Sequence, residues 1–441
     1  MRQQLVGCAP APIDLVVSCC VVTTGVSLAT FALLPTPTFR QESDAGSDQR
    51  LLAVSRPGPK LRDLQTTLDA ERAAGRTRVL HIIQNLNYGG MERLLADIVR
   101  GLDRTHFDCH VLALQYLGRF AEGLREVAQL HLATPMSRWS MLRPTSLARQ
   151  IASIEPDVVH THSGVWYKAG LAARIAGVRK TIHTEHGRAK PDPFADRAID
   201  AIAARRTDVI IAVSASVAEQ LITTHIAPAD RVRIIPNGVE TNVLQPRADD
   251  GALRRELGIS SNAFVLGSIG RLEPIKGYDL MVDAFARLIA DWGEDEPPVL
   301  VVAGDGSERA RLEQSVEQHG LRGRVHFVGW RNDIQSLLST FTLFTMSSRS
   351  EGTSISLLEA MSSGLCPVVT DVGGNAAVLG QQLSHRLVPA GDTRALSAAW
   401  RSALCDPAHR RADARLARTR VETAFGLRAM IAEYEALYKT R

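Results

Sequence analysis

The sequence lacks the patterns that mark several common classes of protein. Its six cysteines form no C-x-x-C pair and have no regular spacing, which favours a reduced, cytoplasmic chain over a disulfide-linked secreted one. No G-x-G-x-x-G follows the first strand of either predicted domain and no G-x-x-x-x-G-K-[ST] occurs, so the NAD-type fingerprint and the P-loop are both missing. Basic residues (51) exceed acidic residues (47) by only four, which argues against a dedicated nucleic-acid-binding protein.

The composition is that of a globular protein. The chain has 441 residues, of which 45% are hydrophobic and 22% are charged. This length suits two folded domains with a remainder. The proportions exclude a disordered chain, a collagen-like fibre and a polytopic membrane protein.

Residues 1–76 differ from the rest and are interpreted as an extension that is expected to be disordered. Within it, residues 15–34 (LVVSCCVVTTGVSLATFALL) are uncharged and long enough to cross a bilayer as a helix. Ser, Thr and Gly dilute this stretch, and only Arg2 precedes it as a basic residue. Three interpretations stay open, namely a weak membrane anchor, a poor signal sequence, and an extension that precedes the functional domains.

From Val79 onward, short apolar runs alternate with amphipathic stretches. The runs predict two series of strands, at 79–83, 107–114, 157–160, 181–184, 209–213 and 232–235, and then at 264–269, 299–303, 325–328, 341–346 and 366–370. Consecutive apolar positions are typical of parallel strands that are covered on both faces. The pattern therefore predicts α/β structure with two Rossmann-like domains that face each other across a cleft.

The polar stretch near residue 245 separates the two series. We expect a first domain at 77–240 and a second at 241–424. An amphipathic helix near the C-terminus, within 425–441, is expected to pack back on the first domain. Ligands of such domains bind at the carboxyl ends of the strands, where the loops of both domains meet.

Two predicted loops could hold a diphosphate. After the first strand, Gly89 and Gly90 lead directly into a helix, where backbone N–H groups are free to bind an anion. After the first strand of the second domain, Arg271 and Lys276 lie in one loop and could converge on a single anion. A plain tight turn and a pair of solvated cations are the alternatives.

Two glutamates lie eight positions apart around the start of another predicted helix. Thr353 or Ser354 would cap this helix, Glu351 would precede it, and Glu359 would lie within it. Carboxylates suit the recognition of vicinal hydroxyl groups of a sugar or ribose, because each accepts two hydrogen bonds. The alternative is a dipole partner and a solvated helix charge.

The order of these motifs closely resembles the retaining glycosyltransferases of family 4. The resemblance rests on the Gly-Gly turn, the Gly-Arg…Lys loop, Gly304-Asp305-Gly306, the two glutamates and the segment AMSSGLCPVVTDVGG that follows them. It covers the chain from Val79 to the C-terminus. The YGGME and TEHGR segments look like those of the exopolysaccharide sugar transferases associated with exosortase/PEP-CTERM systems.

The resemblance implies the GT-B fold, a nucleotide-sugar donor, retention of configuration, and no metal or other cofactor. It assigns the donor diphosphate to Arg271 and Lys276, the ribose hydroxyls to Glu359, and the transferred sugar to Glu351 and His186. The backbone N–H groups of Thr353, Ser354 and Ile355 would cradle phosphate and sugar, and the Gly89-Gly90 loop would close on the phosphates. One departure is Ala377, where the family usually has an acid.

The acceptor is expected to be a glycan or a lipid-linked molecule. Residues 138–143 (RWSMLR) are typical either of contact with an anionic membrane surface or of an ordinary rim. The resulting hypothesis is a cytoplasmic enzyme, at the inner face of the membrane if that contact is made, that acts in exopolysaccharide or cell-surface glycan synthesis. The route of retention stays open between front-face attack and double displacement through Glu351.

Other functions compete with this hypothesis. His160 and His162 end one predicted strand, and His183 and His186 end the next, so four imidazoles could gather as the site of a zinc-dependent hydrolase. A sugar-nucleotide epimerase on the same architecture is a second alternative. A non-catalytic partner protein with the same fold is a third.

Overall fold

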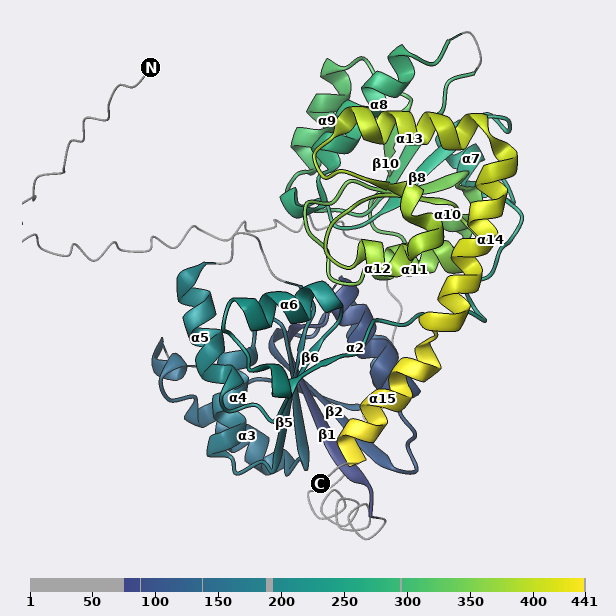
Figure 1. Ribbon diagram of the computed structural model, residues 1–441. Coiled ribbons are helices and arrows are strands. Elements are labelled where there is room, and N and C mark those ends of the chain that lie inside the picture. The colour runs from purple at the N-terminus through teal and green to yellow at the C-terminus, as the bar shows by residue number, and fades with distance from the viewer. Residues whose placement is uncertain (1–74, 88, 137, 188–192, 294–295, 440–441) are drawn as a thin grey trace, which may run out of the picture. The chain divides into compact units, whose positions relative to one another are not determined.

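The computed structural model describes residues 75–439, except 88, 137, 188–192 and 294–295. The predicted extension and its apolar stretch at 15–34 lie outside these residues. The described chain forms two sheets in which every strand pair is parallel (Figure 1). The α/β class and the two Rossmann-like sheets are thus confirmed.

The first sheet has seven strands in the order β3-β2-β1-β4-β5-β6-β7. Six of the seven were predicted. The seventh, β3, was missed because it is short and half-exposed, so it lacks the continuous apolar run of the others. The bounds are β1 (Thr77–Asn85), β2 (Phe107–Tyr116), β3 (Gln129–Leu132), β4 (Val158–His162), β5 (Lys180–Glu185), β6 (Val209–Ala212) and β7 (Val232–Ile234).

Helices connect these strands and cover both faces of the sheet. The first of them, α2, buries one stripe of Leu94, Leu95, Ile98 and Val99, as its periodicity predicts. The bounds are α2 (Gly90–Gly101), η1 (Arg119–Leu124), η2 (Arg138–Met141), α3 (Thr145–Ile154), α4 (Trp166–Ile175), α5 (Phe194–Ala204), α6 (Ala215–Thr223) and η3 (Ala229–Arg231), where η marks a 3-10 helix.

The second sheet has six strands in the order β10-β9-β8-β11-β12-β13. Its last strand was not predicted, because two residues are too short for any periodicity. The bounds are β8 (Val265–Ile269), β9 (Val299–Ala303), β10 (Val325–Phe327), β11 (Leu343–Met346), β12 (Pro367–Thr370) and β13 (Leu387–Val388).

Helices also connect the strands of the second sheet, and the last helix of the chain packs on the first sheet. The bounds are α7 (Ala252–Leu257), η4 (Pro274–Lys276), α8 (Tyr278–Ala290), α9 (Arg309–Gln318), α10 (Ile334–Thr340), α11 (Ile355–Ser362), α12 (Asn375–Leu379), η5 (Gln381–Arg386), α13 (Thr393–Cys405), α14 (Pro407–Ala424) and α15 (Leu427–Lys439). In Figure 1 the last helix, in yellow, lies beside β1 and α2. It buries Tyr434 and Tyr438 there, so the predicted return of the C-terminal helix is confirmed.

The chain passes between the two sheets twice, once after β7 and once between α14 and α15, and these two segments are hydrogen-bonded to each other. Val239 lies on the first of these segments, and its N–H donates to Phe425 O at 2.9 Å. Leu427 N donates back to Val239 O at 3.0 Å. The predicted domain boundary at 240/241 lies between the last strand of the first sheet and the first strand of the second, and it stays a prediction.

A glycine in the centre of β8 lets the core of the second sheet close. A Cβ added to Gly267 would lie 1.9 Å from the nearest carbon of the Phe341 ring, which is itself buried. No side chain fits without displacing that ring. The close packing of the aromatic ring on the strand therefore requires glycine at this position.

We expect Gly267→Ala to destabilise the chain by about 1–3 kcal/mol, because the overpacked ring has to move. Gly170→Ala is the matched control, since Gly170 lies in α4 and a Cβ there meets nothing within 4 Å. That control should leave stability unchanged or raise it by up to about 1 kcal/mol. Urea unfolding of both variants checks this expectation, and equal midpoints for the two would contradict it.

Candidate active site

The predicted site residues lie in loops at the carboxyl ends of strands. The strand order reverses between β1 and β4 in the first sheet and between β8 and β11 in the second. Open α/β sheets bind ligands at such switch points. Residues 86–90 follow β1, His186 follows β5, residues 270–277 follow β8, and residues 347–354 follow β11. All these loops therefore lie at the carboxyl ends of strands, where loops that bind ligands are found in such sheets.

The loop after β8 carries the two predicted cations. Lys276 ends η4, and its Nζ lies 2.6 Å from Glu351 Oε1. The Arg271 side chain is exposed, and it has no hydrogen bond or ion pair among the described residues. Lys276 is therefore paired with Glu351, whereas Arg271 is open to a ligand.

The carboxylate of Glu351 is held in place by two donors. Besides Lys276, the Ser348 Oγ donates to the same Oε1 at 2.6 Å. The Glu351 side chain is only 7% exposed. No hydrogen bond among the described residues uses Oε2, so this oxygen can accept from a ligand hydroxyl.

Helix α11 begins as predicted. The Ser354 side chain caps it and accepts from Leu357 N at 3.4 Å. The N–H groups of Ile355 and Ser356 have no hydrogen bond among the described residues. Unpaired N–H groups at a helix N-terminus attract anions.

The loop before α11 is joined to the first sheet. Thr353 Oγ1 donates to Val213 O, and Asn237 Nδ2 donates to Thr353 O at 2.7 Å. A Cβ added to Gly352 would lie 2.2 Å from His186 O, so the two loops approach closely because this residue is glycine. These contacts bring His186 beside the residues that precede α11. Sequence reasoning did not single out Asn237 as a residue of the site.

The Gly-Gly turn lies on the same side. A Cβ added to Gly90 would lie 3.7 Å from Ile355 Cδ1, so the N-termini of α2 and α11 are near each other. A Cβ added to Gly89 would contact the carboxylate of Glu92 at 2.2 Å. Burial raises the pKa of Glu92, while its own backbone N–H and the charge of Arg271 lower it. Glu92 is thus an acid at the site that sequence reasoning did not single out.

Glu359 lies close to two charged residues of α2 in the first domain. It is buried, and burial raises its pKa to about 7. The charge of Arg93 on α2 opposes this rise, and the charge of Asp97 adds to it. Arg93 Nε lies 3.0 Å from Asp97 Oδ2. The pair has ordinary i,i+4 helix spacing, so no pattern in the sequence indicates that it would lie near Glu359.

The prediction that four histidines gather is wrong for His183. His183 lies opposite Thr161 in the register of β4 and β5, its Nδ1 is 3.0 Å from Thr161 Oγ1, and its ring stacks on Trp166. Successive residues of a strand point to opposite faces, so His183 lies across the sheet from His160 and His162. His81 of β1 takes its place, because it is paired with His160.

The ring nitrogens of these histidines are largely occupied by hydrogen bonds. His160 Nδ1 lies 2.7 Å from Tyr438 Oη, and its Nε2 lies 2.8 Å from Thr184 Oγ1. His162 Nε2 lies 3.3 Å from His81 Nδ1, and its Nδ1 lies 3.1 Å from His186 Nε2. A metal bound by His81, His160 and His162 would have to replace some of these bonds. The arrangement therefore favours a hydrogen-bonded network over the zinc site of the hydrolase alternative.

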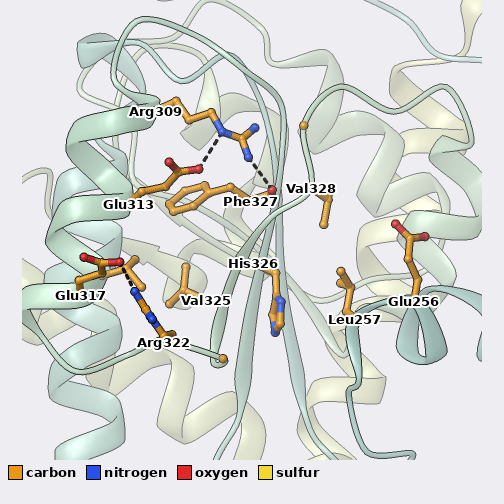
Figure 2. A pocket seen from close by; sticks show the side chains of 13 residues that line it. Glu256, Leu257, Arg309, Glu313, Glu317, Arg322, Val325, His326, Phe327 and Val328 are labelled. Carbon is orange, nitrogen blue, oxygen red and sulfur yellow. Dashed lines mark hydrogen bonds and ion pairs between the residues drawn. The ribbon is translucent and has the colours of Figure 1, made fainter.

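A pocket of about 600 Å³ lies at the outer edge of the second sheet, along β10 and between α7 and α9 (Figure 2). Its rim is charged, and Arg309 donates to Phe327 O at 3.0 Å and to Glu313 Oε1 at 2.9 Å. This arginine covers part of the free edge of the strand. None of the predicted site residues lines the pocket.

Among the described residues, no helix has both the length and the apolar character that a membrane span requires. Residues 138–141 form the 3-10 helix η2, with Met141 42% exposed and Leu142 after it 68% exposed. Exposed apolar side chains occur singly on most proteins. The predicted membrane contact of residues 138–143 stays a prediction.

The fold and the site define an α/β protein with two parallel sheets, whose candidate site residues lie at the carboxyl ends of the strands. Comparison with known families makes the class specific. The model of Glycosyl transferases group 1 matches residues 249–420, and the model of Glycosyltransferase Family 4 matches residues 88–243. The chain therefore belongs to these glycosyltransferases, and the family that its motifs resemble is confirmed.

Several relatives support this assignment. The UDP-Gal:alpha-D-GlcNAc-diphosphoundecaprenol alpha-1,3-galactosyltransferase of Escherichia coli is 30% identical over 256 residues, which are 56% of this chain and 66% of that enzyme. The lipopolysaccharide core biosynthesis mannosyltransferase LpsB of Rhizobium meliloti is 31% identical over 250 residues, which are 53% of this chain and 67% of that enzyme. The match thus spans about two thirds of the length of each relative.

A solved structure confirms the fold. Anabaena HepE, crystallised with UDP and glucose, superposes with a TM-score of 0.72. The superposition covers 83% of this chain and all of HepE, at 22% identity. The GT-B architecture predicted from the resemblance is therefore present.

The buried histidines should make stability depend on pH. Burial lowers the pKa of His81 to about 3 and that of His186 to about 4, against about 6.5 in an unfolded chain. Below about pH 6.5 the unfolded chain binds protons that the folded chain does not, so the free energy of unfolding should fall as the pH drops toward about 4. His81→Leu should make this dependence shallower.

Urea unfolding midpoints between about pH 7.5 and about pH 5 measure the effect. The change in midpoint with pH is compared rather than its value, because other titrating groups are common to both proteins. His319→Leu is the control, since this side chain is 40% exposed. A dependence on pH that is equally steep in the wild type and in His81→Leu would refute the assignment.

Proposed function

We propose that this protein transfers a sugar from a nucleoside-diphosphate sugar to a hydroxyl group of a glycan or lipid-linked acceptor, with retention of configuration. The observation that carries the proposal is the ion pair of Lys276 with Glu351, which joins the loop that carries the exposed Arg271 to the loop that leads into the unpaired N–H groups of α11. The similar proteins support a UDP-sugar as donor, because the E. coli enzyme is named for UDP-Gal and HepE was crystallised with UDP and glucose.

Charge on the leaving diphosphate is the main obstacle that the site has to meet. Departure of the nucleoside diphosphate places negative charge on its oxygens, and the sugar becomes cationic. Arg271, Lys276 and the N-terminus of α11 would supply positive charge that stabilises the oxygens of the leaving diphosphate. Preorganised charges of this kind are often the largest single contribution to an enzyme's rate. We expect the chain to need no metal, which a chelator would test directly.

The surroundings of Glu351 favour the front-face route. Its Oε1 receives Lys276 and Ser348 at 2.6 Å each. An ammonium group at this distance lowers the nucleophilicity of a carboxylate, so Glu351 is better suited to orient the sugar than to attack it. The leaving phosphate would then take the proton of the acceptor hydroxyl.

The acceptor is proposed to be lipid-linked, with a role in exopolysaccharide or cell-surface glycan synthesis. Support comes from the E. coli relative, whose name gives a diphosphoundecaprenol acceptor. The acceptor would approach from the first domain, whose loops after β1 and β5 lie beside α11.

Incubation with UDP-, GDP- and ADP-sugars, followed by release of the nucleotide, tests the proposed activity. Lys276→Met and Arg271→Ala should each lower kcat by about hundredfold or more, because each removes a charge that faces the leaving group. Arg322→Ala is the control, since Arg322 is 83% exposed and lies in the loop between α9 and β10, which carries none of the site residues. Undiminished turnover in both site variants, with folding intact, would refute the proposal.

The pKa of Glu359 predicts how donor binding depends on pH. With a pKa of about 7, Glu359 is mostly protonated at pH 6 and mostly ionised at pH 8. Only the carboxylate accepts hydrogen bonds from both ribose hydroxyls, so the Kd of a nucleotide sugar should fall by about tenfold over this range.

Calorimetric titration of the donor at several pH values measures this dependence. Asp97→Asn should move the midpoint to lower pH, because the charge of Asp97 raises the pKa of Glu359. Glu359→Gln should bind weakly with no dependence on pH. Equal Kd values for the wild type across the range would contradict the assigned role.

A further inference from the structure

A row of three imidazoles leads from the site into the first domain. His186 Nε2 lies 3.1 Å from His162 Nδ1, and His162 Nε2 lies 3.3 Å from His81 Nδ1. The rings are nearly stacked, with centroids 5.4 Å and 5.6 Å apart. His81 and His162 are completely buried, whereas His186 is half-buried at the loop contact with Gly352.

The row lies on one face of the sheet, under helix α15. Beside it, His160 is hydrogen-bonded to Tyr438 Oη at 2.7 Å and to Thr184 Oγ1 at 2.8 Å. Both nitrogens of His160 are thereby used, so this ring packs against the row without entering it. Its centroid is 4.5 Å from that of His162.

All three imidazoles of the row are neutral at pH 7, because burial lowers the pKa of each one. A neutral imidazole has one N–H donor and one acceptor nitrogen. The central His162 uses both of its nitrogens, so the hydrogens of the row can be arranged in only two ways. Either every ring donates toward the site, or every ring donates away from it.

The two arrangements differ at the ends of the row. When the rings donate toward the site, His186 carries its hydrogen on Nδ1, and His81 Nε2 is a bare acceptor. When they donate away, His186 Nδ1 is the bare acceptor, and His81 Nε2 carries a hydrogen. His81 Nε2 is buried and has no partner among the described residues, and orphaned N–H groups are rarer in proteins than under-satisfied acceptors.

A ligand adds a second bias in the same direction. His186 Nδ1 has no hydrogen bond among the described residues. An anion near this end attracts N–H dipoles that point toward it. Both terms therefore favour the arrangement in which the rings donate toward the site.

We propose that His162 and His81 are positioning residues, which fix His186 as the tautomer with its hydrogen on Nδ1 and so present a donor to the sugar or phosphate oxygen. This inference rests on the proposed function for the role of His186, but the placement of the hydrogens can be measured without turnover. His186 then acts as a hydrogen-bond donor rather than as a base.

Long-range ¹⁵N–¹H NMR of the full chain, with labelled histidine, identifies which nitrogen of His186 carries hydrogen. We expect a protonated Nδ1 and a bare Nε2 in the wild type. In His162→Leu the ring of His186 loses its partner, so the tautomers should mix and kcat should fall by about tenfold. In His162→Asn the introduced amide can still donate to His186 Nε2, so the tautomer and most of kcat should be retained.

His183→Leu is the matched control. His183 is equally buried on the neighbouring strand β5, and its Nε2 also has no hydrogen-bond partner among the described residues, but it lies on the opposite face. If kcat fell as much in His183→Leu as in His162→Leu, the loss would be due to disturbed packing of the core, and the proposal would be overturned. A protonated Nε2 on His186 in the wild type would overturn it as well. If the wild type turns over no donor, the proposed function fails, while the NMR result still decides the tautomer.

Discussion

The close backbone contact between the loop before α11 and the end of β5 is the constraint on which the site depends. Gly352 lies where any side chain would collide with His186 O. The hydrogen bonds of Thr353 to Val213 and of Asn237 to Thr353 hold the two loops together on either side of this contact. The N-terminus of α11 and the end of the histidine row thus meet although they belong to different sheets. A side chain at Gly352 would separate them without touching a single charged group.

The charged groups of the site largely neutralise one another before any donor binds. Lys276 is paired with Glu351, Arg93 is paired with Asp97 beside the buried Glu359, and Arg271 acts on Glu92. Half-buried charges require such partners, because an isolated charge away from water is costly. A diphosphate would have to compete with carboxylates for the same cations. Glu351 can keep Lys276 on its Oε1 and still accept a hydrogen bond from the sugar through Oε2.

The sequence allowed most of the fold to be predicted because buried parallel strands are apolar at consecutive positions. It failed at β3 and β13, where exposure or shortness removes that signal. The start of α11 was predictable from its capping serine, since capping is a local interaction. Arg93 and Asp97 were not, because their approach to Glu359 depends on how α2 meets α11, which no local pattern encodes.

The histidines show the same division between local and non-local information. That His183 points away from His160 and His162 follows from strand alternation once the register of β4 and β5 is known. That His81 joins them follows only from the pairing of β1 with β4, about eighty positions apart in the chain. Neutral imidazoles are tolerated in this core because nearly every ring nitrogen has a partner. At the buried end of the row, His81 Nε2 has no hydrogen-bond partner among the described residues, and this makes the two directions of the row unequal in free energy. An apolar side chain at position 81 would move the unpartnered nitrogen to His162 Nε2 and leave the same bias in a shorter row. The buried end of the row thus controls the chemistry that its exposed end can offer.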